Sequence, residues 1–186
     1  MRWRTYSITW KVPRTILRQT SIRRWIRLFI PVEKMSNIFN EDFQDFLTAL
    51  NKSNVKYVLV GGYSVIYHGF PRTTGGLDIF VEISAGNYER ISKAFLDFGM
   101  PVFDTMQENF LGSKDFNVFT FGRAPVSTEI LKEISGLTFK EVYEKAIKPD
   151  IENIKMGVIN LSHLKENKTQ SGRNKDPNDL ENLPQF

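Results

Sequence analysis

Short β-rich runs alternate with segments of helical periodicity, and this alternation limits the fold more than any other feature of the chain. Residues 55–60 form a compact β-rich run that stops at Gly61-Gly62, and residues 77–82 alternate apolar and polar positions. Residues 41–50, 87–98 and 139–146 place apolar side chains at helical spacing. The sequence has no internal repeat. We therefore expect one α/β (α+β) domain, with a mixed β-sheet flanked by helices.

The same patterns predict the remaining elements. A short helix is expected at 63–68, a turn-rich loop at 69–76, and two strands at 117–121 and 127–131 joined by a Gly-Arg-Ala-Pro turn. Met156-Gly157 predicts the turn of a hairpin over 154–161. Ser162 is the expected cap of a helix that runs through Gln170. Asp176 is the expected cap of a last short helix, with Pro177 at its first position.

The charges divide the chain into two unlike regions. Residues 1–34 carry nine Lys and Arg against one Glu, whereas residues 35–186 carry sixteen Lys and Arg against twenty Asp and Glu. We expect residues 1–34 to be a basic, poorly ordered arm and residues 35–186 to be the domain. Within the arm, Ile22, Trp25, Ile26 and Phe29 share one helical face. Three interpretations remain open: a transit peptide, a helix that binds RNA or an acidic membrane surface, or sequence translated ahead of the true start.

Composition excludes several classes of function. The longest run of apolar residues is the four from Tyr57 to Val60, so we expect no stable membrane insertion. The absence of Cys excludes disulfides, zinc–thiolate sites and cysteine nucleophiles, and it fits a cytoplasmic protein. Because the chain has only two His, any metal would be held by carboxylates, which favours Mg²⁺ or Mn²⁺.

The stretch from Val60 to Ile79 carries the strongest chemical signal. Glycines at the end of a strand leave backbone N–H groups open to a phosphate, and Gly61-Gly62 stands at such a point. Arg72 and Thr74 would add donors from the following loop, and Asp78 would add a hard oxygen ligand. The simpler interpretation is that Gly61-Gly62 forms a tight turn and Arg72 is a solvated loop charge. His68 is expected to brace the loop.

The combination of these residues resembles the nucleotidyltransferase superfamily. That family has an apolar residue, Gly-Gly or Gly-Ser, a gap, and then Asp-apolar-Asp/Glu-apolar; here thirteen residues separate Gly62 from Gly76-Leu77-Asp78-Ile79. The family's third carboxylate comes from a neighbouring strand, where Glu129 stands. The tail is similar to that of small nucleotidyltransferases from prokaryotic toxin–antitoxin and abortive-infection systems, through Lys168, Arg173, Lys175-Asp176 and Asp179-Leu180. The matches span residues 55–183.

The resemblance implies a reaction, a cofactor and a set of site residues. A nucleoside monophosphate would move from a nucleoside triphosphate (NTP) to a hydroxyl of RNA, protein or a small molecule, and a cognate toxin or antitoxin would be a partner. Asp78 and Glu129 would be catalytic and would hold Mg²⁺ (or Mn²⁺). The nucleotide would be bound by Gly61, Gly62, Ser64, Arg72, Thr74, Lys168 and Asp176.

One departure from the family pattern affects the expected activity. Gly76 stands where the family has the first of two Asp residues, which share one face of a strand about 6.6 Å apart and bridge two metal ions. Asp78 with Glu129 could still hold one ion. We expect Mg²⁺-dependent NTP binding, and a second interpretation makes the chain a catalytically weak or inactive module that binds a nucleotide or a partner. Gly76 is also a candidate for a positive φ.

Overall fold

A four-stranded mixed sheet forms the centre of the molecule. The computed structural model describes residues 38–100, 102, 104–113, 117–123 and 126–185, so the expected arm at 1–34 lies outside the described residues. The strands are ordered β1-β2-β4-β3, with β2 and β4 parallel and the other two pairs antiparallel. Their bounds are β1 (Tyr57–Leu59), β2 (Gly76–Val81), β3 (Val118–Arg123) and β4 (Val126–Leu131).

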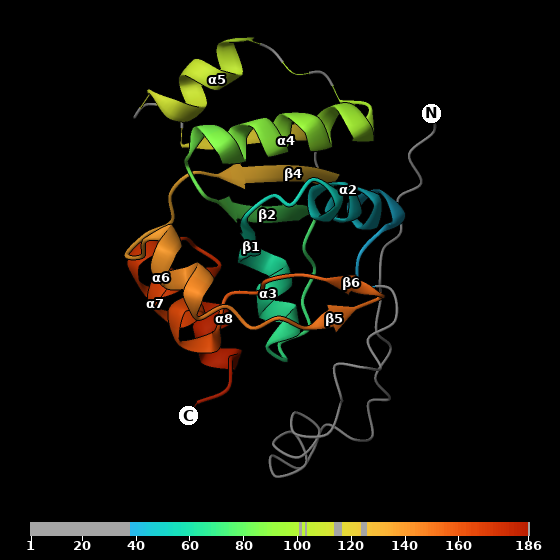
Figure 1. Ribbon diagram of the computed structural model, residues 1–186. Helices are drawn as coiled ribbons and strands as arrows, with labels where there is room; N and C mark the ends of the chain where they lie inside the picture. The colour runs from blue at the N-terminus through green and yellow to red at the C-terminus, as the bar shows by residue number, and fades with distance from the viewer. Residues whose placement is uncertain (1–37, 101, 103, 114–116, 124–125, 186) are drawn as a thin grey trace.

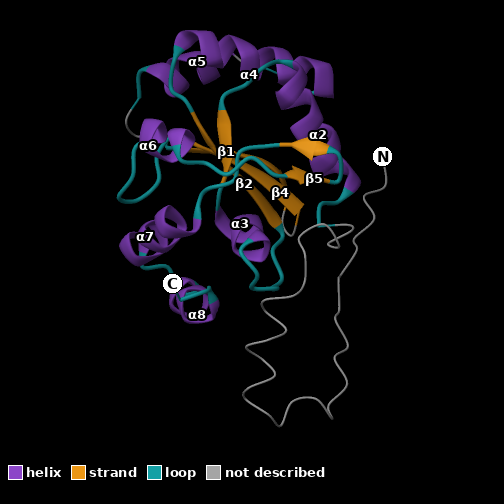
Figure 2. Cartoon of the chain, turned by 60° about the horizontal axis from the view of Figure 1, so that its bottom comes forward, coloured by secondary structure: helices purple, strands orange, loops and turns teal. Residues whose placement is uncertain are grey.

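Helices cover both faces of this sheet, as the sequence predicted (Figures 1 and 2). One face packs against α2 (Glu41–Lys52) and α4 (Ala85–Phe98), with α5 (Asp104–Leu111) beside α4. The opposite face packs against α3 (Gly61–Tyr67), α6 (Phe139–Glu144) and α7 (Leu161–Ser171), and α8 (Asp176–Asn182) packs on α7. No helix in the described part of the chain has both the length and the apolarity that crossing a bilayer requires.

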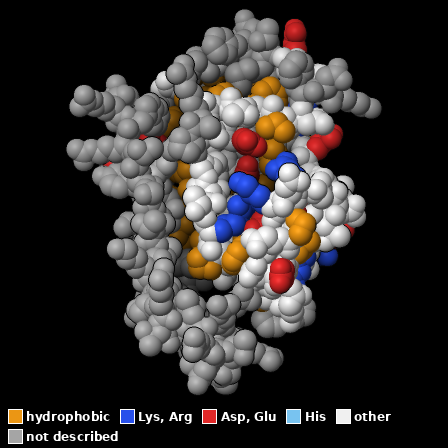
Figure 3. Space-filling view, turned by 180° about the vertical axis from the view of Figure 1, so that it is seen from behind, with side chains coloured by type: hydrophobic (Ala, Val, Ile, Leu, Met, Phe, Trp, Pro, Cys, Tyr) orange, Lys and Arg blue, Asp and Glu red, His pale blue; other side chains and the backbone are white. Residues whose placement is uncertain are grey.

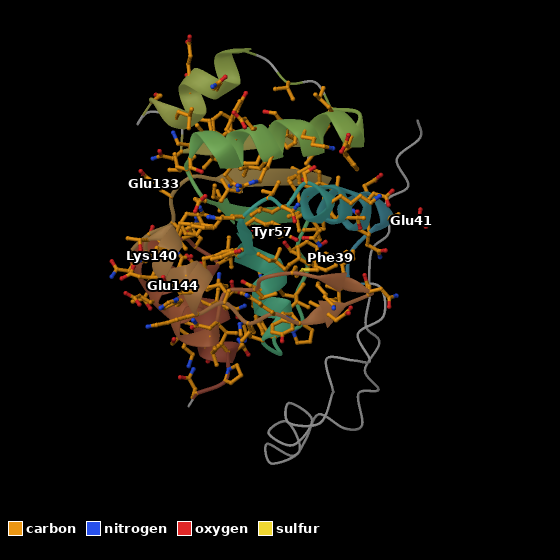
Figure 4. The ribbon with its side chains drawn as sticks, in the orientation of Figure 1. Phe39, Glu41, Tyr57, Glu133, Lys140 and Glu144 are labelled. Carbon is orange, nitrogen blue, oxygen red and sulfur yellow. The ribbon has the colours of Figure 1, made fainter. Side chains whose placement is uncertain are left out.

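The alternation along β2 explains why two cores form. Leu77, Ile79 and Val81 are buried in the core under α2 and α4, and Phe80 is buried in the second core. Successive side chains of a strand point to opposite faces. Asp78 therefore lies on the face that α3 and α7 cover. Figure 4 shows Phe39 and Tyr57 in the interior, where both side chains belong to the first core.

Most element boundaries are set by local sequence signals. Asn40 caps α2 by accepting a hydrogen bond from the Phe43 N–H, and Thr138 with Glu141 forms a capping box at the start of α6. Gly99 ends α4 at φ +83°, a conformation that favours glycine. The strands around Val58, Ile79, Phe119 and Ile130 are present, with bounds that differ by one or two residues from the predicted ones.

The predicted hairpin at 154–161 is wrong. The hairpin consists of β5 (Asp150–Ile151) and β6 (Ile154–Lys155), and its turn is Glu152-Asn153, both at positive φ. The residues that follow Met156-Gly157 instead lie beside β1, where Val158 forms a bridge with Leu59. Backbone pairing with a buried strand thus overrides the local turn signal of glycine.

Three smaller expectations also need correction. Helix α7 is capped by Asn160, whose side chain accepts the His163 N–H, and not by Ser162. Asp176 is the first residue of α8 and not its cap, because its carboxylate is bonded to other groups. Gly76 does not have a positive φ. The helix α5 had no predicted counterpart.

Candidate functional site

The Gly61-Gly62 pair lies directly against the side chains of β2 and of the loop before it. Gly61 has φ +63°, and a Cβ there would collide with the Asp78 carboxylate. A Cβ on Gly62 would collide with Thr74 Oγ1 and lie 3.0 Å from Arg72 Nη2. The Gly62 N–H donates to Asp78 Oδ2 at 3.3 Å. Glycine is therefore required at both positions for Asp78, Thr74 and Arg72 to approach the backbone this closely.

Asp78 and Glu129 form a pair of carboxylates on neighbouring parallel strands. They are register partners in β2 and β4, as expected for the family's second and third acids. Burial raises the pKa of the Asp78 carboxyl to about 6, and repulsion from Glu129 adds to the rise. The Gly62 N–H, Arg173 and Arg72 act in the opposite direction. Two like charges at a partly buried site are stabilised by a cation placed between them.

Gly76 and Ser127 leave space two residues along the strands from this pair. They are partners in β2 and β4, and a Cβ built on Gly76 would lie 3.4 Å from Ser127 Oγ and 3.5 Å from the Ser127 carbonyl oxygen. Both distances are ordinary van der Waals contacts. The backbone thus accepts a side chain at Gly76, on the same face of β2 as Asp78.

A buried network of ion pairs joins the loop before β2 to the two C-terminal helices. Lys168 Nζ lies 2.9 Å from Asp176 Oδ1 and 2.6 Å from Asp179 Oδ2, and Arg72 Nε lies 3.2 Å from Asp179 Oδ1. The side chains of Lys168 and Asp179 are 7% and 1% exposed. Burial opposes ionisation of Asp176, but hydrogen bonds from Ser171 and Lys168 hold its pKa below the usual range. Arg72 is therefore oriented by Asp179 and is not a solvated loop charge.

These groups surround a cavity of about 320 Å³ between α3, β2 and the segment that joins α7 to α8. Its charged lining consists of four cations, Arg72, Lys168, Arg173 and Lys175, and two acids, Asp78 and Asp176. On the face turned away from the view of Figure 1, Lys and Arg side chains gather beside Asp and Glu side chains (Figure 3). When Asp179 and Glu129 are included, the four cationic side chains are matched by four acidic side chains. A cation bound by Asp78 and Glu129 would give the cavity the excess positive charge that a polyphosphate requires.

The structure brings most of the predicted residues together, and their roles stay predictions. The cavity is lined by Gly61, Gly62, Arg72, Asp78, Lys168 and Asp176. Thr74 lies beside Gly62, and its hydroxyl donates to the Gly76 carbonyl at 3.3 Å. Ser64 is buried, and its hydroxyl donates to the Gly61 carbonyl at 2.7 Å, so it supports the glycine turn instead of facing the cavity. His68 braces this region, as predicted, with Nε2 lying 2.8 Å from the Ile159 carbonyl oxygen.

Arg173, Asn174 and Lys175 in the cavity lining were not assigned to the site from the sequence, and neither was Asp179, which joins the ion-pair network. The place of Asp179 in the Lys-Asp-x-x-Asp-Leu segment was the available signal, but nothing local showed that it would face both Lys168 and Arg72. The two contacts come from α7 and from a loop about a hundred residues earlier in the chain. These three side chains meet because α8 packs on α7 and the Arg72 side chain reaches Asp179 from the loop before β2.

The donor set fits one hard divalent cation and does not fit two. Asp78 and Glu129 supply carboxylate oxygens from adjacent strands, which suit Mg²⁺ or Mn²⁺. Among the described residues, no group of three or more Asp, Glu, His and Cys side chains could hold a metal ion. A two-ion centre needs a further bridging carboxylate, and Gly76 cannot supply it.

A larger hollow of about 900 Å³ lies near α6, apart from these residues. Its lining includes Phe80, Phe139 and Tyr143, and its rim includes the ion pairs Lys56–Glu82 and Lys140–Glu144. Figure 4 shows Glu133, Lys140 and Glu144 around this helix. None of the predicted site residues lines this hollow, so the smaller cavity is the candidate site despite its size.

Comparisons with known proteins add little. No protein-family model and no curated protein matches the chain. The structure is similar to the crystal structure of a candidate nucleotidyltransferase from Thermotoga maritima, with 15% identity and a TM-score of 0.47, over 75% of this chain and 88% of that chain. A TM-score below 0.5 supports no inference about the site or the reaction. The proposals below rest on the residues of this chain.

Proposed function

We propose that this chain is a nucleotidyltransferase-type protein that binds an NTP, together with Mg²⁺, in the cavity beside Asp78. The observation that carries the proposal is the pairing of Asp78 with Glu129 next to a cavity lined by Arg72, Lys168, Arg173 and Lys175. The spacing of these residues along the chain is the spacing that resembles the superfamily. Charge-assisted hydrogen bonds from guanidinium and ammonium groups suit phosphate oxygens.

The reaction for which this arrangement is suited is transfer of a nucleoside monophosphate from an NTP to a hydroxyl. The hydroxyl oxygen attacks the α-phosphorus, the bond between the α- and β-phosphates breaks, and pyrophosphate and the hydroxyl proton are released. Bound Mg²⁺ would polarise a phosphate oxygen and lower the pKa of an attacking hydroxyl. Arg72, oriented by Asp179, and Arg173, at the mouth of the cavity, would neutralise charge on the phosphates. Because Gly76 supplies no carboxylate, we propose that transfer is slower by orders of magnitude than in a site with all three acids.

A second candidate function is binding without turnover, and Gly76 is the observation that favours it. In that case the nucleotide, or a partner protein such as a cognate toxin or antitoxin, is recognised and released unchanged. The acceptor in the enzymatic alternative is a hydroxyl of RNA, protein or a small molecule. A cytoplasmic setting is part of the proposal, since it rests on the absence of cysteine.

Calorimetric titration of the full chain with ATP tests the proposal. With Mg²⁺ present we expect binding in the micromolar to millimolar range, weakened at least tenfold by EDTA, by Asp78→Ala and by Arg173→Ala. The matched control is Lys140→Ala on α6, whose side chain is 83% exposed and lies outside the cavity; this variant should bind as the wild type does. Absence of heat with ATP, GTP, CTP and UTP, in either Mg²⁺ or Mn²⁺, would contradict the proposal.

A further inference from the structure

The side chains around the candidate cavity differ from those of a site that recognises a nucleobase. We infer that the site selects its ligand by the polyphosphate and is indifferent to the base, so that inorganic tripolyphosphate binds as well as any NTP. This inference rests on the proposed function and narrows it. Its basis is the chemical character of the cavity lining and the position of the nearest aromatic side chains.

The described lining contains no aromatic and no apolar side chain. It consists of two glycines, four cations, two acids and Asn174. Bases are held in proteins by stacking on aromatic rings or guanidinium planes and by hydrogen bonds to their edges. Asn174 is the one neutral amide available for such an edge contact, and it is exposed at the mouth of the cavity. Every other polar side chain in the lining is charged and suits phosphate or metal.

The aromatic residues nearest in the chain pack in the two cores: Tyr63 and Phe80 are buried there, and Phe70, two residues before Arg72, is partly buried against the second core. Tyr63 follows the glycine pair directly, but it is 6% exposed and its ring packs against Phe39 at 4.9 Å and Phe43 at 5.8 Å. Phe80, two residues after Asp78, is buried against Phe139 at 5.2 Å. Neither ring is available to stack on a base. Stacking on a ring adds on the order of tenfold or more in affinity for any base, so its absence removes the main advantage of an NTP over tripolyphosphate. A preference between bases would need hydrogen bonds to their edges, for which the lining offers only the Asn174 amide.

The size of the cavity agrees with this assignment. At about 320 Å³ it lies near the lower end of the roughly 300–1,000 Å³ of small-molecule sites. Phosphates placed against Arg72, Arg173 and Lys175 would occupy the space beside Asp78. The sugar and base would then extend through the mouth toward solvent, where the described residues offer only Asn174 and the side chains of Arg173 and Lys175.

Separate titrations of the full chain with five ligands test the inference. ATP, GTP, CTP, UTP and inorganic tripolyphosphate are each titrated in the calorimeter with Mg²⁺ at fixed ionic strength. We expect the five dissociation constants to agree within about threefold, and Arg173→Ala to weaken all five by a similar factor while Lys140→Ala changes none.

The outcomes separate the inference from the proposed function. A preference of more than tenfold for one NTP, or binding of the NTPs without tripolyphosphate, would overturn base indifference and leave NTP binding intact. Binding of none of the five ligands would overturn both. If Arg173→Ala weakened the binding of some NTPs much more than that of others, Arg173 would contact the base. This result would also contradict the inference.

Discussion

The surroundings of Asp78 oppose the ionisation of its carboxyl group. Its carboxylate is partly buried, it faces Glu129 across the strand pair, and its pKa is raised to about 6. A carboxyl group whose pKa in the folded protein lies above its unfolded value of 3.8 lowers stability when it ionises. The destabilisation is absent well below pH 4 and complete above the folded pKa. Binding of a cation is the event that would reverse it.

We therefore predict that Asp78→Asn stabilises the metal-free protein at neutral pH. In EDTA at pH 7.5 the free energy of unfolding should rise by about 2–3 kcal/mol, because Asn keeps the acceptor for the Gly62 N–H without the charge. At pH 4.5 the gain should fall to about a third of this value, because folded Asp78 is then mostly protonated while the carboxyl group in the unfolded chain is still mostly ionised. Urea unfolding at both pH values measures the difference.

The control for this prediction is Asp97→Asn on α4. Asp97 forms an exposed ion pair with Lys93, which contributes little to stability. Its variant should change the free energy of unfolding by less than about 0.5 kcal/mol at both pH values. A gain in Asp78→Asn of equal size at pH 4.5 and pH 7.5 would show that charge burial is not its cause.

At the scale of elements, strands and amphipathic helices could be predicted because their signals are local. The alternation over 77–82 predicted that β2 has two unlike faces. The helical spacing at 41–50 and 139–146 predicted α2 and α6, which Asn40 and Thr138 cap. The pairing of Asp78 with Glu129 was also expected, from the family resemblance and not from spacing alone. These parts of the fold and site depend on short stretches of sequence.

The elements that could not be predicted depend on contacts distant in the chain. Val158 lies beside Leu59 because a buried strand edge needs backbone partners, and this moved the hairpin turn to Glu152-Asn153. The end of α5 is held by Lys132, whose buried ammonium donates to the carbonyls of Asn109 and Ser113. The hydrophobic periodicity of a sequence contains no information on contacts between distant residues. The Asp179 network was missed for the same reason.

That network leads to a prediction about how α7, α8 and the loop before β2 hold together. In Asp179→Asn, Arg72 loses its acidic partner in the network, and Lys168 keeps only Asp176. Removing one partner of a buried ion pair typically costs about 3–5 kcal/mol, because a buried charge loses its compensation. We expect a loss of this size in the free energy of unfolding, with a parallel loss of NTP affinity.

Glu144→Gln provides the matched comparison, because Glu144 forms the exposed i,i+4 pair with Lys140 on α6. It should change stability by less than about 0.5 kcal/mol. Urea unfolding of both variants, with ATP titration of each, separates the two cases. If Asp179→Asn unfolded with wild-type stability and bound ATP normally, the network would have no role in orienting Arg72.

At the scale of the whole molecule, the sheet and its two helical layers are complete within the described residues. Taken together, the two cores draw on residues from Phe39 to Leu183, so residues 35–186 remain our prediction for the domain. The candidate site joins three distant parts of the chain: the β1–α3 turn, the β2–β4 strand pair and the α7–α8 segment. Its central feature is the pair of carboxylates Asp78 and Glu129, which we propose as the metal site, beside Gly76, which carries no side chain.

Labelled-nucleotide transfer by Gly76→Asp tests this central claim most directly. Gly76 has no positive φ, and its Cβ would make only ordinary contacts with Ser127, so the variant should fold. Its new carboxylate would share a face of β2 with Asp78 and complete the bridging pair. With Mg²⁺ and α-labelled NTP, we expect transfer onto RNA or protein to rise by orders of magnitude over a wild type that shows little or none. Robust transfer by the wild type, abolished by Asp78→Ala, or a folded Gly76→Asp variant that binds metal and NTP yet transfers nothing, would contradict the account.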